Sequence, residues 1–246
     1  MHGQEQKGRC ACHCSRRNRG DWLKCFDDFR LGSFTANGKH LFDNGINRIG
    51  NIFVTNEFYV HFEREFHKLL DRCYEIMKEK GRPLCTWEII REMGRYMEDT
   101  DFKDKETSII YWAYKNDIPI ISTCFTDGSI GDILFFHRNK RKDFYVDISQ
   151  DMEKIIKISM DADKTGVISL GGGSSKHYTL NAQIFREGCE FAVYINSHDG
   201  DDASDSGAEI SEAVTWGKVK DGGIKVKVKG DASIIFPLII AGTNEK

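Results

Sequence analysis

The sequence lacks any apolar run of 18 residues, the length at which a segment becomes a candidate for a membrane-spanning helix. It has only three prolines, which excludes a proline-rich linker protein. It also lacks a strong charge of either sign, because 35 Lys and Arg residues face 38 Asp and Glu residues, for a net charge of −3. We therefore expect no membrane-spanning segment and no nucleic-acid partner.

Residues 1–20 lack the apolar centre of a secretory signal peptide, and eight cysteines in 246 residues are too sparse for a disulfide scaffold. We expect a cytoplasmic protein in which residues 1–20 are a disordered polar segment and residues 21–246 form one domain. Cys10, Cys12, His13 and Cys14 cluster near the start. Their spacing differs from the C-x2-C and H-x3-H spacings of structural zinc sites, so we expect no metal site.

The distribution of apolar residues predicts an α/β fold. Residues 56–80 carry apolar side chains at helical spacing, and residues 86–97 predict a second helix. Short apolar runs at 118–122, 144–148, 165–170 and 191–195 then alternate with helix-like segments at 130–138, 150–161 and 174–187. Strands buried on both faces that alternate with helices form a mostly parallel sheet, and ligands bind such sheets at the carboxyl ends of the strands.

Two of the loops that follow these strands allow more than one interpretation. Gly171, Gly172 and Gly173 precede a predicted helix, where backbone amides approach a phosphate closely, yet glycine-rich turns also serve as plain structural devices. Asp127 and Asp132 lie near another predicted helix start, where aspartate commonly caps backbone amides. On these residues alone, nucleotide binding and a structural role both stay open.

A third loop is strongly acidic: Asp199, Asp201, Asp202, Asp205, Glu209 and Glu212 lie within fourteen residues. The spacing does not match the calcium-binding EF-hand. A solvated loop, a calcium site of another kind and a site for a polycationic ligand remain possible interpretations. Carboxylates spaced along a groove match the spaced ammonium groups of such a ligand.

Lys218 follows Glu212 and Trp216 at the end of a short predicted helix that starts near residue 208. One interpretation is a cation that complements the helix C-terminus. The other is an amine nucleophile that forms a Schiff base in a pocket walled by Trp216.

Several segments, in order along the chain, resemble deoxyhypusine synthases from about Asp21 to the C-terminus. The resemblance is carried by long motifs: 44–51 (NGINRIGN), 126–132 (TDGSIGD), 170–177 (LGGGSSKH), 204–208 (SDSGA), 212–218 (EAVTWGK) and 231–233 (DAS). It implies a Rossmann-like sheet and NAD-dependent transfer of the 4-aminobutyl group of spermidine to one lysine of the precursor of eukaryotic translation initiation factor 5A, the first step of hypusine biosynthesis. Hydride passes from spermidine to NAD, an enzyme lysine carries the resulting imine, and the target lysine takes it over before reduction by the retained NADH. Family members are tetramers.

The resemblance also implies roles for individual residues. Lys218 is the expected imine-forming lysine, and His177 is expected to assist proton removal. The spermidine-binding residues would be Asp132, Tyr194, Asp205, Glu212 and Trp216. The NAD-binding residues would be Asp127, Ser197, Asp202, Ser206, Asp231 and Ala232.

The sequence departs from the family in two places. Family members extend far upstream of Asp21, and Arg19 and Gly20 stand where an acidic pair of the NAD site is expected; Ala203 replaces a usual glycine. We therefore expect a shortened member that lacks part of the N-terminal half of the fold. An alternative is a non-catalytic paralogue that acts as a partner or regulatory subunit of a full-length synthase. Assembly as a homotetramer or as a heteromer with a full-length paralogue follows from these two interpretations.

Overall fold

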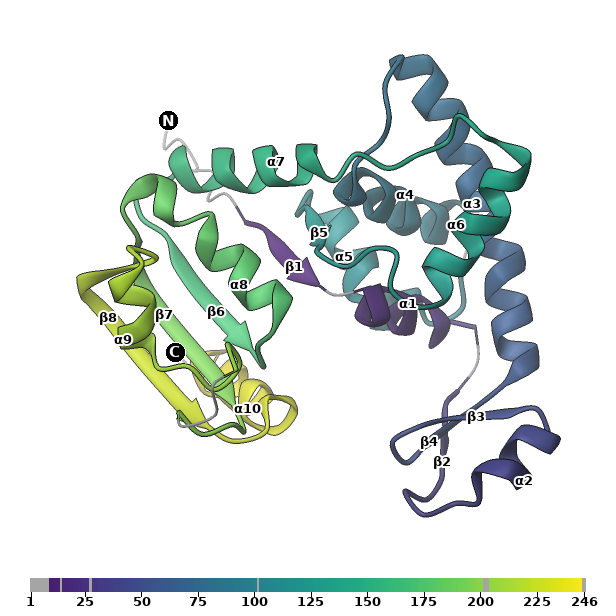
Figure 1. The fold of residues 1–246 in the computed structure, drawn as a ribbon, viewed down its shortest axis with the longest axis horizontal. Helices are drawn as coiled ribbons and strands as arrows, with labels where there is room; N and C mark the ends of the chain where they lie inside the picture. Colours follow the sequence, from purple (N-terminus) through teal and green to yellow (C-terminus); the bar gives the residue numbers. More distant parts are fainter. Residues whose placement is uncertain (1–8, 14, 27, 101, 201–203, 245–246) are drawn as a thin grey trace. The chain divides into compact units, whose positions relative to one another are not determined.

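A computed structural model describes residues 9–13, 15–26, 28–100, 102–200 and 204–244. The chain divides into two compact units (Figure 1). Unit 1 comprises Met1–Cys12 and Ile148–Lys246, and unit 2 comprises His13–Asp147. Helix α1 (Ser15–Leu23) begins inside the segment for which disorder is expected from the sequence. The single domain over 21–246 stays a prediction.

Unit 2 is mainly helical. Besides α1, its helices are α2 (Gly38–Asp43), α3 (Asn56–Lys80), α4 (Thr86–Asp99), the 3-10 helix η1 (Lys105–Thr107), α5 (Ile109–Lys115) and α6 (Ser129–Lys140). Strands β2 (Arg30–Leu31), β3 (Ile46–Ile49) and β4 (Ile52–Thr55) form an antiparallel sheet in the order β2-β4-β3. Strand β5 (Ile120–Ser122) is buried along its whole length.

Helix α3 is the element that the sequence predicts best. Its apolar residues face the core as expected, because residues three and four apart share one face of a helix. The helix ends at Gly81, whose φ of +64° is a left-handed conformation that glycine adopts without strain. Its buried residues are Phe58, Phe62, Phe66, Leu69, Leu70, Cys73, Tyr74 and Met77.

Residues near the start of unit 2 join α1 to the rest of that unit. Trp22 is fully buried, and its ring packs edge-on against Phe62 and Phe66 of α3 at centroid distances of 5.9 and 5.8 Å. The Asp21 carboxylate accepts hydrogen bonds from the amides of Ile109 and Ile110 at 3.1 and 3.0 Å. These amides open α5, so Asp21 completes the hydrogen bonding of that helix start from a distant part of the chain.

The strand predicted at residues 144–148 is wrong. In this run only Val146 is paired, in a single parallel bridge with Leu84. Phe144 is fully buried, but Tyr145 and Ile148 are exposed. A short apolar run becomes a strand when a neighbouring strand pairs with it, and among the described residues that pairing stops after one residue.

Unit 1 contains a parallel sheet with flanking helices. Strands β6 (Gly166–Leu170), β7 (Cys189–Asn196) and β8 (Val219–Lys229) run in the order β6-β7-β8, and all pairs are parallel. The helices are α7 (Ser149–Met160), α8 (Ser174–Asn181), the 3-10 helix η2 (Ile184–Arg186), α9 (Ile210–Thr215) and α10 (Ala232–Asn244). Strand β1 (Ala11–His13) spans the sequence boundary between the units. The mixed α/β class with parallel strands is therefore confirmed.

The two faces of this sheet differ. On one face, Ala192 and Tyr194 of β7 are buried against Leu180 of α8 and Ala213 of α9. On the other face, Ile168 of β6 and Ile224 of β8 are 61% and 63% exposed. Strand β8 alternates accordingly, because successive side chains of a strand point to opposite faces. Its apolar set is Ile224, Val226 and Val228, and its basic set is Lys225, Lys227 and Lys229.

No helix among the described residues is both long enough and apolar enough to cross a membrane.

Candidate functional site

The carboxyl edge of the parallel sheet gathers three loops of unit 1. The amide of Gly171, just after β6, donates to the Ile195 carbonyl at 2.8 Å, and the amide of Gly230, just after β8, donates to the Asn196 carbonyl at 2.8 Å. Helix α10 starts from this edge, beside the strand arrowheads in Figure 1. The edge is where ligands bind in sheets of this kind.

The glycine turn packs closely against the acidic loop. Gly171 and Gly173 have φ values of +81° and +74°, which side-chain-bearing residues rarely adopt. A Cβ atom on Gly172 would lie 2.5 Å from the Cα of Ser206, so only glycine fits here. The turn therefore fixes both the start of α8 and the position of residues 204–207.

Helix α8 carries His177 toward this loop. Nδ1 of His177 lies 3.4 Å from Oδ1 of Asp205, within hydrogen-bond and ion-pair distance. The His177 side chain is about half exposed, so a ligand can reach its ring. The second carboxylate oxygen of Asp205, Oδ2, is buried and has no hydrogen-bond partner among the described residues.

Tyr194 lies beneath this pair on the covered face of the sheet. It is fully buried, and its hydroxyl has no hydrogen-bond partner among the described residues. Burial, followed by the influence of Cys189 and of the negative charges of Asp205 and Glu212, raises the pKa of Tyr194. The hydroxyl is therefore neutral, and it is free to bond to a ligand.

Lys176 is a site residue that the sequence analysis missed. It is buried, its Nζ donates to the backbone carbonyl of Asp205, and the same atom lies 4.4 Å from the centroid of the Tyr194 ring. Burial lowers the pKa of Lys176, with the charges of Asp205, Lys227, Glu212 and Lys218 acting around it. The available signal was its spacing, since Lys176 and Leu180 are four apart and both lie on the buried face of α8.

Strand β8 neutralises part of the acidic loop. Lys229 pairs with Asp199, and Lys227 pairs with Glu209. Asp205 and Glu212 have no ion pair with lysine or arginine among the described residues. Of the carboxylates that the sequence offers to a polycation, these two are therefore the available ones that the structure describes.

Lys218 is placed by the end of α9. Gly217 has a φ of +68°, and the chain then turns so that the Lys218 amide donates to the Ala213 carbonyl at 2.9 Å. The Lys218 carbonyl accepts from the Cys189 amide at 3.1 Å, which ties its backbone to the start of β7 and β8. Its side chain is only 8% exposed, with Nζ 5.8 Å from the ring centroid of Trp216, which is 64% exposed.

The residues expected to bind NAD in unit 1 lie at the carboxyl edge. Ser197 follows β7, Ser206 touches the glycine turn, and Asp231 and Ala232 open α10. The Asp231 side chain accepts hydrogen bonds from the Ser233 hydroxyl and amide at 2.6 and 2.8 Å, and these lower the pKa of Asp231. Nδ2 of Asn196 at the same edge is buried without a hydrogen-bond partner among the described residues. Asp202 lies outside the described residues.

Asp127 and Asp132 belong to unit 2, just before and within α6. Asp132 lines a cavity of about 330 Å³ in that unit, together with Tyr59, Glu63, Ser129 and Phe136. A carboxylate pair and aromatic rings around one cavity suit an ammonium ligand. Nothing in the sequence pattern points to Tyr59 or Glu63, because both lie within an ordinary amphipathic helix.

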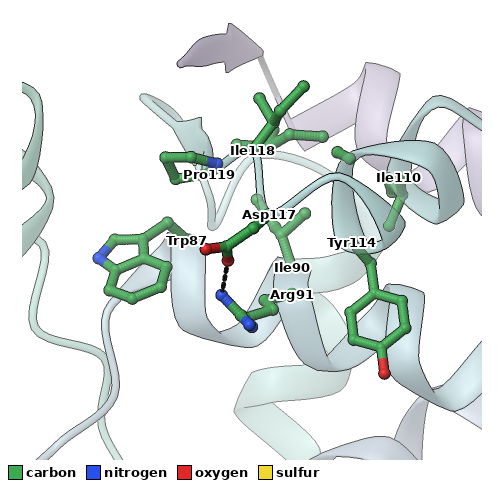
Figure 2. A pocket seen from close by; sticks show the side chains of 10 residues that line it. Trp87, Ile90, Arg91, Ile110, Tyr114, Asp117, Ile118 and Pro119 are labelled. Atoms are coloured by element: carbon green, nitrogen blue, oxygen red, sulfur yellow. Dashed lines mark hydrogen bonds and ion pairs between the residues drawn. The ribbon is translucent and has the colours of Figure 1, made fainter. Parts of the chain in front are cut away.

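A second cleft of unit 2 contains none of the predicted site residues. Figure 2 shows its apolar walls, with Trp87 and Ile90 from α4 and Tyr114 from α5. Arg91 and Asp117 also line it, and they form an ion pair with each other. Because the charges at this cleft neutralise each other, it adds no free charged group to the candidate site.

The comparisons with known proteins agree with one another. A family model described as "DS: Deoxyhypusine synthase" matches residues 18–243. The chain is 44% identical over 222 residues to the "Probable deoxyhypusine synthase" of Pyrococcus furiosus, covering 89% of this chain and 66% of that protein. It is 43% identical over 241 residues to the "Deoxyhypusine synthase" of Kluyveromyces lactis, covering 91% of this chain and 62% of that protein. The chain thus spans slightly less than two thirds of the length of these curated relatives.

A solved structure shares the fold. The crystal structure described as a "putative deoxyhypusine synthase from Entamoeba histolytica" matches with a TM-score of 0.57 and 23% identity. The match covers 98% of this chain and 76% of that one.

Proposed function

The chain belongs to the deoxyhypusine synthase family, and from this premise we propose that it transfers the 4-aminobutyl group of spermidine to one lysine of the precursor of eukaryotic translation initiation factor 5A. The observation that carries the proposal is the placement of Lys218. It is a buried residue whose amine lies beside an exposed tryptophan, and its charge is one of those that act on the buried Lys176. An amine held in this way is suited to nucleophilic catalysis through an imine.

Binding of the polyamine is assigned to the available carboxylates. Asp205 and Glu212 accept hydrogen bonds from ammonium groups of spermidine, and the unpartnered Tyr194 hydroxyl bonds to a nitrogen of the same chain. The exposed Trp216 ring covers methylene groups. Asp132 in unit 2 is proposed as a further carboxylate for the substrate.

Proton removal is assigned to His177. When Nδ1–H donates to Asp205, the lone pair of Nε2 is left to accept a proton from the substrate during its dehydrogenation. Asp205 thus holds the ring in one tautomer and orients it.

Lys218 then carries the aminobutyl group. Its amine attacks the imine carbon of the oxidised substrate, a new C–N bond forms, and the bond to the remaining diamine breaks. The amine of the acceptor lysine next adds to the imine carbon and releases Lys218. The exchange moves the group without net oxidation, and Lys218 returns as a free amine.

When bound, NAD would accept a hydride from spermidine and later return that hydride to the final imine. The residues fit such a group, because open space beside Gly171 and Gly173 allows close approach and Nδ2 of Asn196 at the same edge is a buried donor with no partner among the described residues. Ser197, Ser206, Asp231 and Ala232, with Asp202 and with Asp127 of unit 2, are proposed to hold it. The proposal includes a Rossmann-like sheet, and assembly as a homotetramer or with a longer paralogue.

The test is transfer of label from radioactive spermidine to the factor precursor in the presence of NAD, combined with borohydride trapping. We expect Lys218→Arg to lower transfer by at least about 1,000-fold and to abolish the trapped adduct, because a guanidinium keeps the charge but forms no imine. Lys225→Arg, at an exposed lysine of β8, is the matched control and should retain activity.

An adduct on another lysine, or transfer by the Lys218→Arg variant, would exclude the assignment of Lys218. If the protein instead binds spermidine but performs no transfer, and transfer is restored when a full-length synthase is added, the result would favour the partner-subunit role.

A further inference from the structure

The cavity that Asp132 lines, called the Asp132 cavity below, lies between two helices of unit 2. These helices, α3 and α6, pack against each other (Figure 1). The cavity has a volume of about 330 Å³, and small-molecule sites begin at about 300 Å³. The buried side chains of Phe62 and Ile133 contribute an apolar part of its lining. The cavity is therefore suited to a small organic ligand with an apolar chain.

Each of the two helices contributes one carboxylate to this cavity. Asp132 comes from α6 and Glu63 from α3, and both residues are exposed to solvent. Oε1 of Glu63 lies 3.7 Å from Nε2 of His67, a ring that is charged only when it is protonated. Among the described residues, neither carboxylate forms an ion pair with lysine or arginine. Both are thus available to an ammonium group of a ligand.

Arg19 of α1 places a guanidinium beside the same cavity. Its Nη1 donates to the hydroxyl of Ser129 at 3.3 Å, and its Cζ lies 5.6 Å from the centroid of the Tyr59 ring. Ser129 and Tyr59 both line the cavity. A Cβ atom on Gly128 would lie only 3.1 Å from Nη1 of Arg19, so a glycine at this position lets the guanidinium approach. All these residues belong to unit 2.

The spacing of residues along the two helices separates the guanidinium from the carboxylates. On α6, Ser129 and Asp132 are three residues apart. On α3, Tyr59 and Glu63 are four residues apart. In each helix, the residue that contacts Arg19 therefore lies about one turn, or about 5.4 Å, before the carboxylate on the same face. The cavity has a cation at one end and carboxylates at the other.

We propose that the Asp132 cavity binds an ω-amino acid, with its ammonium group at Asp132 and Glu63 and its carboxylate at Arg19. Opposite charges at the two ends of a cavity favour a ligand whose own ends carry the complementary charges. A guanidinium is well suited to a carboxylate, because it presents several N–H donors in one plane. A chain of four methylene groups is long enough to span one helical turn and to contact the apolar lining.

Arg19 is then a specificity-determining residue of this cavity. A diamine of the same length would place its second ammonium group beside the guanidinium, where like charges repel. Only one ammonium group of a polyamine therefore uses the Asp132 cavity. The inference goes beyond the proposed transfer reaction and is tested by binding alone, so a failure of transfer would leave it standing.

The experiment compares three ligands that differ at one end only. 5-Aminopentanoate, n-butylamine and 1,4-diaminobutane share an ammonium group on a four-carbon chain, which ends in a carboxylate, a hydrogen atom or a second ammonium group. The amide NMR shifts of Ser129 and Glu63 report binding to the cavity in titrations of the full chain. We expect 5-aminopentanoate to bind at least about fivefold more tightly than n-butylamine, and 1,4-diaminobutane to bind no more tightly than n-butylamine.

Variants identify the charge that causes this order. Arg19→Gln should reverse it, so that 1,4-diaminobutane binds more tightly than 5-aminopentanoate. Arg138→Gln is the matched control, because it removes the same charge from an exposed position in the last turn of α6 and should leave the order unchanged. Asp132→Asn should weaken the binding of all three ligands, since each relies on an ammonium group.

An order of affinities that is the same in the Arg19→Gln variant and in the unmodified chain would overturn the proposal. If Arg19→Gln does not fold, the unmodified chain decides, because 5-aminopentanoate must still bind more tightly than 1,4-diaminobutane. Binding that leaves the amide shifts of Ser129 and Glu63 unchanged would place the ligand elsewhere and would also overturn the proposal.

Discussion

Tyr194 is a single residue on which stability and binding are expected to move in opposite directions. A buried hydroxyl without a partner costs about 1–3 kcal/mol. Tyr194→Phe should therefore leave the free energy of unfolding of the ligand-free protein unchanged or raise it by about 1 kcal/mol. Under the proposed function, the same change should raise KM for spermidine. Calorimetry and initial rates measure the two effects.

The matched control for this residue is Tyr178→Phe, which removes a second unpartnered hydroxyl of unit 1. It should have a similar effect on stability and none on KM. A large loss of stability in Tyr194→Phe would mean that the hydroxyl has a partner in the native protein. An unchanged KM would remove Tyr194 from the proposed spermidine pocket.

At the scale of elements, the glycine turn between β6 and α8 is the tightest junction of the site. Gly172→Ala places a methyl group 2.5 Å from the Cα of Ser206, where backbone must move to admit it. We expect it to lower the free energy of unfolding by about 1–3 kcal/mol, as overpacking commonly does. Urea denaturation measures the change.

Gly222→Ala in β8 is the control for this substitution, because no atom lies within 4 Å of its added methyl group. It should change stability by no more than about 0.5 kcal/mol. Equal effects of the two substitutions would show that close packing at Gly172 is not what requires glycine there.

A helix or strand could be predicted from the sequence where its own residue pattern is enough to determine its conformation. Helix α3 buries one stripe of its own surface, so its periodicity is sufficient. Strand β8 was missed, because its lysines and glycines are typical of a solvated loop and its strand conformation depends on pairing with β7. The burial of Lys176 was missed for the same reason, since it results from contacts with residues of β7 and the acidic loop.

At the scale of the whole molecule, each unit holds a glutamate whose carboxylate is surrounded by basic groups: the partly buried Glu190 in unit 1 and the buried Glu88 in unit 2. Burial would raise the pKa of Glu190 in unit 1, but hydrogen bonds from Arg186, Lys220 and the Thr165 amide outweigh it and lower the pKa to about 2. Hydrogen bonds from Arg82, Lys80 and Cys85 likewise outweigh burial and lower the pKa of Glu88 in unit 2 to about 2.

Because both pKa values are depressed in the folded state, this stabilisation is present above about pH 4.3, the value for an unfolded glutamate. It is lost as the pH falls from there to about 2. We expect both units to lose stability over this one range. Glu190→Gln should cost about 2 kcal/mol at pH 6 and flatten the acid dependence of unit 1. Urea denaturation at several pH values measures both.

The exposed Glu153 of α7 provides the control for the acid dependence. Glu153→Gln should leave the free energy of unfolding at pH 6 unchanged within the error of the measurement, because surface ion pairs contribute little. An acid dependence of Glu190→Gln equal to that of the unmodified chain would mean that Glu190 does not cause the loss at low pH.

The lysines of β8 have a consequence for how a cationic ligand arrives. Lys227 and Lys229 act as built-in counter-ions of Glu209 and Asp199, so these two carboxylates present little net field to solution. The rate at which a polyamine is captured should therefore depend less on ionic strength than it would if these two carboxylates were unpaired. Selectivity for the polyamine would then come from short-range contacts with Asp205 and Glu212, after the ligand has reached the loop.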